Sequence, residues 1–239
     1  KDQKRDTFIL GEGLYDKPGE KVEPKTPEVL SSFATYANNR LGLAEWLMSP
    51  ENPLFSRVQV NRIWQQFFGR GIVKSVDNFG LQSDKPTHPL LLDWLAVDFR
   101  ENNWDLHHLI RKLVLSATYR QSSNWRSDVD DPENKLLARG PSFRLPAELI
   151  RDQALAASGL LSNKVGGPSV RPYQAEGIWE DLNAPKSHEE KYVQGSGKDL
   201  YRKSLYTYWR RAALHPSMAT FDAPSRDVCS VSRESTNTP

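Results

Sequence analysis

The feature that most constrains the fold is an apolar repeat of helical period, which recurs between residues 60 and 114. Apolar side chains at relative positions 0, 3, 4, 7 and 8 share one face of an α-helix, because the helix has 3.6 residues per turn. Helices with matching apolar faces are expected to share one core. Two stretches have the full spacing and a third has a shorter stripe: Val60, Ile63, Trp64, Phe67 and Phe68; Leu106, Leu109, Ile110, Leu113 and Val114; and Leu91, Leu92, Leu95 and Phe99.

Residues that start or stop helices flank these stripes. A short helix is expected at Arg40–Met48, ended by Pro50. Gly69 favours the end of the next helix, and Thr87 is expected to cap the one after it, ahead of a proline in the first turn. Asp105 is expected to cap the last. The sequence therefore predicts a helical core over residues 39–123.

The N-terminal region has a different character. Residues 1–38 hold one short apolar run, Thr7 to Leu10, followed by a polar stretch punctuated by prolines. We expect one strand and then an irregular, extended arm.

Residues 124–239 are expected to form a helix followed by loops and strands, packed on the core as one domain. The polar stretch from Gln121 to Pro141 is typical of a linker or a long surface connection. A helix is expected from Pro146 to near Gly159. Two later stretches, 204–210 and 227–233, alternate with a period of two and predict a short strand pair. The expected fold class is mainly α with a small β component (α+β), with long loops.

Composition excludes several classes of function. The 32 basic and 30 acidic residues nearly balance, which disfavours nucleic acid as a partner. The apolar runs are far shorter than the ~20 residues of a transmembrane helix. The single cysteine, Cys229, excludes an internal disulfide, a cysteine-based metal site and c-type haem attachment within this chain.

One group of aromatic and polar residues in the second half is the candidate binding surface. Aromatic faces with Arg and Asp groups could bind a sugar, a peptide or a partner protein. The alternative, which we favour, is a structural network that holds irregular loops in place. The group comprises Tyr173, Gln174, Trp179, Arg202, Tyr206, Asp222, Arg226 and Arg233.

Other reactive residues carry weaker hypotheses. His88 and Asp93 could form an acid–base pair, but their spacing near a helix start favours a role in the helix terminus. The adjacent residues His107 and His108 point in different directions on a helix, which disfavours a shared metal. Cys229 is expected to be buried in an alternating strand. No metal site and no catalytic residues are predicted.

An ordered series of motifs resembles a known family. It includes Arg40 to Leu47, Val60-Asn61-Arg62-Ile63-Trp64, Ser116 to Ser123, Arg144-Leu145-Pro146-Ala147-Glu148, Gly166 to Val170, Tyr201 to Thr207, Phe221-Asp222-Ala223-Pro224 and Thr236-Asn237-Thr238-Pro239. The chain resembles the C-terminal domain of unknown function of large exported proteins from planctomycetes and related bacteria. In that family the domain often lies downstream of a c-type cytochrome domain, and its sequence continues past the last motif.

The resemblance implies a segment of a larger protein in a periplasmic or cell-surface setting. Any haem c would belong to a neighbouring domain, because this chain has no attachment motif and no evident cofactor of its own. We expect a non-catalytic scaffold or interaction domain whose partners are other domains of the same polypeptide. The alternatives are a glycan-binding or hydrolytic module, and a support domain for a neighbouring cytochrome in electron transfer.

Overall fold

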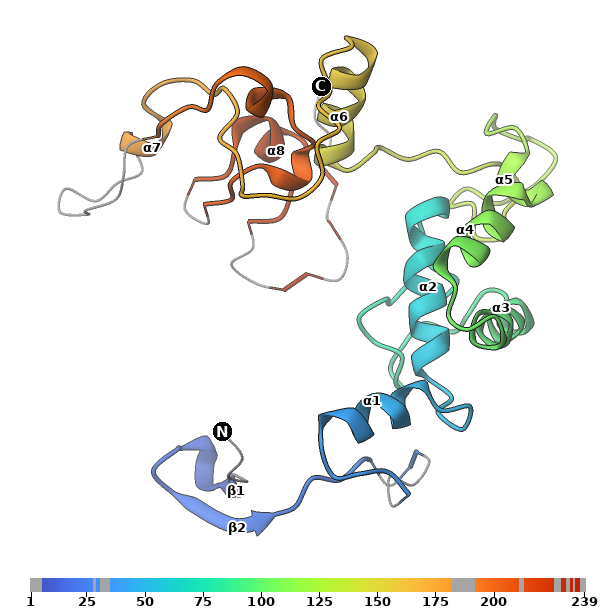
Figure 1. Cartoon of the computed structure of the whole chain (residues 1–239). Coiled ribbons are helices and arrows are strands. Elements are labelled where there is room, and N and C mark those ends of the chain that lie inside the picture. Colours follow the sequence, from blue (N-terminus) through green and yellow to red (C-terminus); the bar gives the residue numbers. More distant parts are fainter. Residues whose placement is uncertain are drawn as a thin grey trace. The chain divides into compact units, whose positions relative to one another are not determined.

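The protein divides into two compact units, residues 1–141 and residues 142–239 (Figure 1). In the computed structural model, the described residues are 6–27, 29–30, 35–181, 192–210, 213–225, 229–230, 233 and 235–236. Each unit is considered by itself. Whether the second unit packs on the helical core as one domain stays a prediction.

The N-terminal region forms a β-hairpin instead of a strand with an irregular arm. The predicted strand β1 (Thr7–Leu10) pairs antiparallel with β2 (Pro18–Val22), across a turn that contains the short 3₁₀ helix η1 (Gly11–Gly13). The expectation of an irregular arm is therefore wrong over β2. Proline is tolerated as the first residue of a strand, and this is the position that Pro18 occupies.

The predicted helices of the first unit are all present. They are α1 (Arg40–Met48), α2 (Phe55–Phe68), α3 (Pro89–Glu101) and α4 (Leu106–Leu115), followed by the short α5 (Ala117–Arg120). Asp105 caps α4 as expected, because its carboxylate accepts hydrogen bonds from the backbone N–H groups of His107 and His108. Gly69 ends α2 with a φ of 75°, which suits glycine. The expected cap of α3 is wrong by one residue: His88 is the cap, and the Thr87 hydroxyl instead lies 3.3 Å from the Ile72 carbonyl oxygen.

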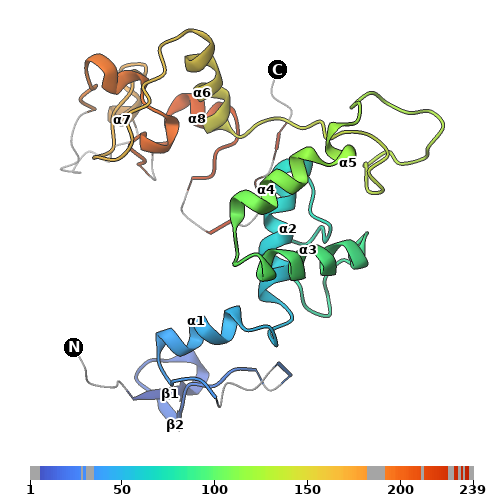
Figure 2. The same ribbon diagram turned by 45° about the vertical axis from the view of Figure 1, so that its right-hand side comes forward.

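The predicted apolar stripes meet in one core. Helix α2 packs against α3 and α4, as the second view shows (Figure 2). Stacking adds to apolar burial here, because the rings of Trp64 and Phe68 lie 3.9 Å apart and nearly parallel. The buried members are Val60, Trp64, Phe68, Ile72, Val73, Leu92, Leu95, Phe99, Leu109 and Leu113.

Two buried polar side chains fix the loops around this core. The Asn61 side chain is fully buried and bonds both backbone groups of Val73, with two distances of 2.9 Å. Asp131 organises the polar segment 121–141, which has no regular strand or helix of its own. Burial raises the pKa of the Asp131 carboxyl, but the backbone N–H groups of Leu136, Lys135 and Ala138 outweigh this effect and hold the pKa below its usual value.

The second unit contains short elements separated by long irregular stretches. Its elements are α6 (Ala147–Ala157), α7 (Ile178–Asp181), η2 (Gly197–Tyr201), η3 (Ser204–Tyr206) and α8 (Pro216–Thr220). A small cluster of Ala147, Met218 and Ala223 is buried between α6 and α8. Regular backbone pairing is therefore sparse in this unit, and side chains must hold much of its chain.

The mainly helical fold class with a small β component is confirmed, but its sheet is the N-terminal hairpin. The strand predicted at residues 204–210 is wrong, because Ser204–Tyr206 forms a 3₁₀ turn and Thr207 makes only an isolated bridge with Val170. Much of the second predicted strand, 227–233, lies outside the described residues. None of the helices in the described chain is long and apolar enough to cross a membrane.

Candidate ligand-binding site

Arg202 is the organising side chain of the second unit. It is only 2% exposed, and its guanidinium donates hydrogen bonds to the carbonyl oxygens of Lys164, Gly166 and Pro168 at 3.2, 2.6 and 3.1 Å. The guanidinium carbon also lies 3.8 Å from the centroid of the Tyr206 ring. One buried cation therefore fixes the path of the whole loop from 164 to 168.

The loop can wrap around Arg202 because it contains two glycines. Gly166 and Gly167 have φ angles of 79° and 88°, a region that side chains with a Cβ rarely adopt. The Tyr206 hydroxyl oxygen accepts a hydrogen bond of 2.8 Å from the Gly166 N–H. The turn predicted here thus encloses a charged side chain.

Helix α6 holds the segment that carries Arg202. Arg151 donates to the carbonyl oxygens of Arg202 and Leu200, each at 2.9 Å, and Asp152 accepts from the backbone N–H of Ser204 at 2.7 Å. Burial lowers the pKa of Arg151 from its usual value, and the nearby Asp152 carboxylate partly offsets this. The position of Arg202 is thereby set from both sides, by the loop that it binds and by the helix behind it.

A cluster of aromatic and basic residues lies around Trp179. This indole is 4% exposed, and the guanidinium carbons of Arg210 and Arg171 lie 4.6 and 5.5 Å from its centroid. The rings of Tyr192 and Tyr208 contact it at 5.0 and 5.9 Å. Trp179 is therefore part of the packed interior of the unit.

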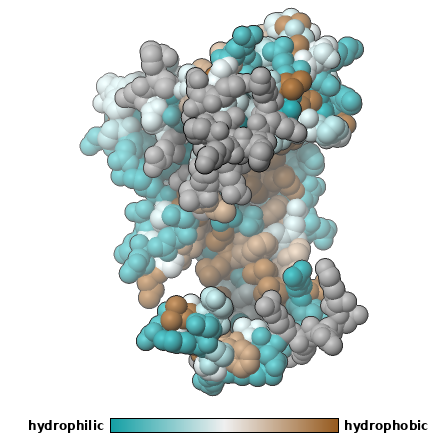
Figure 3. All heavy atoms as spheres, turned by 90° about the vertical axis from the view of Figure 1, so that its left-hand side faces the viewer, coloured by the Kyte–Doolittle hydropathy of each residue, from teal (hydrophilic) through white to brown (hydrophobic). Residues whose placement is uncertain are grey.

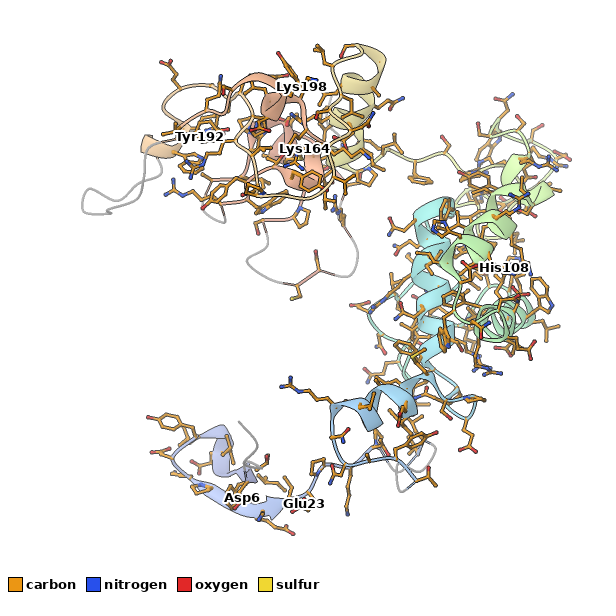
Figure 4. The ribbon with its side chains drawn as sticks, viewed as in Figure 1. Asp6, Glu23, His108, Lys164, Tyr192 and Lys198 are labelled. Atoms are coloured by element: carbon orange, nitrogen blue, oxygen red, sulfur yellow. The ribbon has the colours of Figure 1, made fainter. Side chains whose placement is uncertain are left out.

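A pocket of about 460 Å³ lies against these two groups. Its volume falls in the range of roughly 300–1,000 Å³ typical of small-molecule sites. Lys164 reaches it from the glycine-containing loop, and the side-chain view labels this residue in the second unit (Figure 4). Its lining is rich in groups that can form hydrogen bonds or ion pairs: Lys164, Ser169, Arg171, Gln194, Asp199, Arg202 and Tyr208.

The predicted binding surface does not form one site. Arg202 lines the pocket and Tyr206 stacks on Arg202, whereas Trp179 is buried in the neighbouring cluster. The Tyr173 side chain is 55% exposed, and its carbonyl oxygen lies 3.1 Å from His215 Nε2. Gln174 is partly exposed.

Two more members of the predicted surface belong to a separate group near the C-terminal end. Asp222 forms an ion pair with Arg144 and accepts hydrogen bonds from the backbone and hydroxyl of Thr236. The Thr236 backbone N–H, followed by Arg144, lowers the pKa of Asp222 to about 2. Arg233 makes a bidentate pair with Glu148 at 2.6 and 3.0 Å. Arg226 lies outside the described residues.

The weaker candidates have structural partners. Asp93 pairs with Arg57 rather than with His88, whose Nδ1 lies 3.0 Å from the Thr87 hydroxyl. His108 joins Asp98 between α3 and α4. No group of three or more metal-ligating side chains is found among the described residues. Cys229 is exposed and lies in irregular chain, so the prediction of a buried strand position is wrong.

Three residues that line the pocket, Lys164, Arg171 and Asp199, were not predicted from the sequence to be neighbours. Lys164 and Arg171 come from separate irregular stretches and Asp199 from η2, and no periodic pattern links such residues. The available signal was local: Gly166-Gly167-Pro168 predicts a tight turn, and such a turn brings its flanking residues together.

Comparison with known proteins supplies the family and no function. Neither a curated protein nor a solved structure matches the chain. One family model matches residues 39–239, and its description is PSD1, a protein of unknown function (DUF1553). The match covers every α-helix of the described residues, α1 to α8. The chain therefore belongs to the PSD1 (DUF1553) family.

Proposed function

We propose that this chain is a non-catalytic interaction domain of an exported multidomain bacterial protein, whose second unit presents a preformed pocket to a ligand or partner. The observation that carries the proposal is the fixing of the 164–168 loop by buried Arg202. A site that is already ordered loses less conformational entropy on binding, which favours affinity.

The structural roles of the buried arginine and tryptophan side chains support this assignment. Arg202, Arg151 and Trp179 hold the chain in position from within the unit. Their contacts maintain the shape of a pocket in a region that has little regular backbone pairing. Buried cations that fix the shape of one pocket suit this unit to the recognition of a ligand or partner.

The cellular setting in this proposal comes from the family resemblance. The resemblance supports a periplasmic or cell-surface setting, with other domains of the same polypeptide as proposed partners and a cytochrome domain among them. Co-purification of the segment with a haem-bearing part of the same polypeptide would support this setting.

One observation favours the hydrolytic alternative. His215 Nδ1 lies 2.9 Å from the Ser217 hydroxyl, and its Nε2 lies 3.1 Å from the Tyr173 carbonyl oxygen. Burial lowers the pKa of His215, which favours the neutral form that a general base needs. Both contacts also serve the start of α8, because His215 is its N-terminal cap.

A panel of neutral and acidic polysaccharides and peptides tests the proposal. Some of these polysaccharides and peptides should bind the purified chain and so retard its migration in affinity electrophoresis. The chain should release no products from them. Product formation that Ser217→Ala abolishes would replace the interaction domain with a hydrolase. Absence of retention for every member of the panel would contradict the proposed function.

A further inference from the structure

We propose that the pocket selects ligands bearing an oxyanion group, either a carboxylate or a phosphate ester. This inference rests on the proposed function, because it names the chemistry that the pocket recognises. Among the described residues that line the pocket, three are basic (Lys164, Arg171 and Arg202) and one is acidic (Asp199). A pocket with this balance attracts anions, and its walls lower the local dielectric and strengthen the attraction.

The charge of Arg202 is the first argument. Its guanidinium binds three carbonyl oxygens, and no carboxylate of the described chain lies within ion-pair distance of it. Carbonyl dipoles satisfy hydrogen bonds but leave the full positive charge, which is unfavourable at a side chain that is 98% buried. Its Nε atom is also buried without a hydrogen-bond partner in the described part of the protein. An anion in the adjoining pocket would stabilise this charge.

The second argument is the placement of Lys164 and Asp199 on the pocket wall. Neither residue forms an ion pair within the described ranges, and both are exposed. The Lys164 ammonium can therefore move to meet a ligand oxyanion, while its backbone carbonyl stays bonded to Arg202. Asp199 opposes the binding of the same group by repulsion. These two side chains should shift anion affinity in opposite directions without altering the fold.

Three probes of similar size isolate the charge. Glucuronate carries a carboxylate, glucose 6-phosphate carries a phosphate ester, and glucose carries neither. Binding to the full chain is followed by the NMR shift of the Gly195 amide, which lines the pocket and whose N–H donates to the Arg171 carbonyl oxygen. We expect saturable shifts with one or both anions, weakened between 50 and 500 mM salt, and no shift with glucose.

Charge variants provide the matched controls. Lys164→Gln should weaken anion binding by a factor of roughly two to five, the value of one exposed charge contact. Lys198→Gln should leave it unchanged, because Lys198 is an exposed lysine of the same unit that does not line the pocket (Figure 4). Asp199→Asn should strengthen binding by a similar factor.

The outcomes separate this inference from the proposed function. If glucose binds as tightly as the two anions, the pocket is a binding site and the assignment of its ligand class is overturned. Equal effects of Lys164→Gln and Lys198→Gln would also overturn it. If none of the three probes shifts Gly195, the anion inference fails, while retention of a polymer from the panel would still support an interaction domain.

Discussion

Removing the Asn61 side chain should destabilise the first unit far more than its size suggests. Asn61→Ala leaves the N–H and carbonyl of Val73 without their partners, and Val73 is only 3% exposed. Each buried group stranded in this way costs about 1–3 kcal/mol, so the loss should reach about 2–6 kcal/mol. This is a large part of the roughly 5–15 kcal/mol that stabilises a typical domain.

Urea unfolding followed by circular dichroism at 222 nm suits this test, because the longest helices, α2 and α3, belong to the first unit. Asn102→Ala is the matched control, since its side chain makes an exposed 2.8 Å bond to the Asp98 carbonyl oxygen. That variant should lose less than about 1 kcal/mol. If Asn61→Ala costs no more than Asn102→Ala, the argument from buried backbone groups is wrong.

Four further outcomes are expected. Gly71→Ala should lower the stability of the first unit by about 1–3 kcal/mol, because a Cβ would lie 2.4 Å from the Val73 carbonyl oxygen, and an unchanged urea midpoint would contradict this. Carboxyl NMR should find Asp222 titrating near pH 2. Because the pKa of Asp222 is lower in the folded state than in the unfolded chain, its contribution to folding stability should be full above about pH 4 and disappear as the pH falls to 2. His215 has a lowered pKa when folded, so the folded state binds fewer protons and the second unit should lose stability as the pH falls below about 6.5; His215→Gln should remove that dependence. Cys229 should react with a thiol reagent under native conditions as fast as in urea, and strong native protection would show that it is not exposed.

The helices of the first unit were predictable because their signal is periodic and local. Five apolar side chains at helical spacing define α4, and Asp105 marks its start. The N-terminal hairpin was only half predictable. The apolar run of β1 is visible in the sequence, but β2 is polar and begins with Pro18, so only its pairing with β1 makes it a strand.

The second unit resisted prediction for a different reason. Alternating residues at 204–210 suggested a strand, yet Arg151 and Asp152 bind this segment from α6 and hold it as a turn. Such contacts join residues about fifty positions apart and leave no periodic trace. Arg202 was identified as a candidate, but its role depends on three carbonyl groups, which every residue type supplies and no sequence pattern reveals.

The contacts of Asp222 also determine how this unit would respond to mechanical load. Arg144 stands near the start of the unit, and it bonds both Asp222 and the carbonyl oxygen of Thr236, 92 residues further along the chain. Tension applied through the chain on either side would therefore load the contacts among Arg144, Asp222 and Thr236 before it reached α6 or α8. Because these contacts are a few partly exposed bonds, they should rupture early and at a force that depends on pH. The Arg202 loop lies between Arg144 and Thr236 in the chain, so it should bear load only after these contacts have broken.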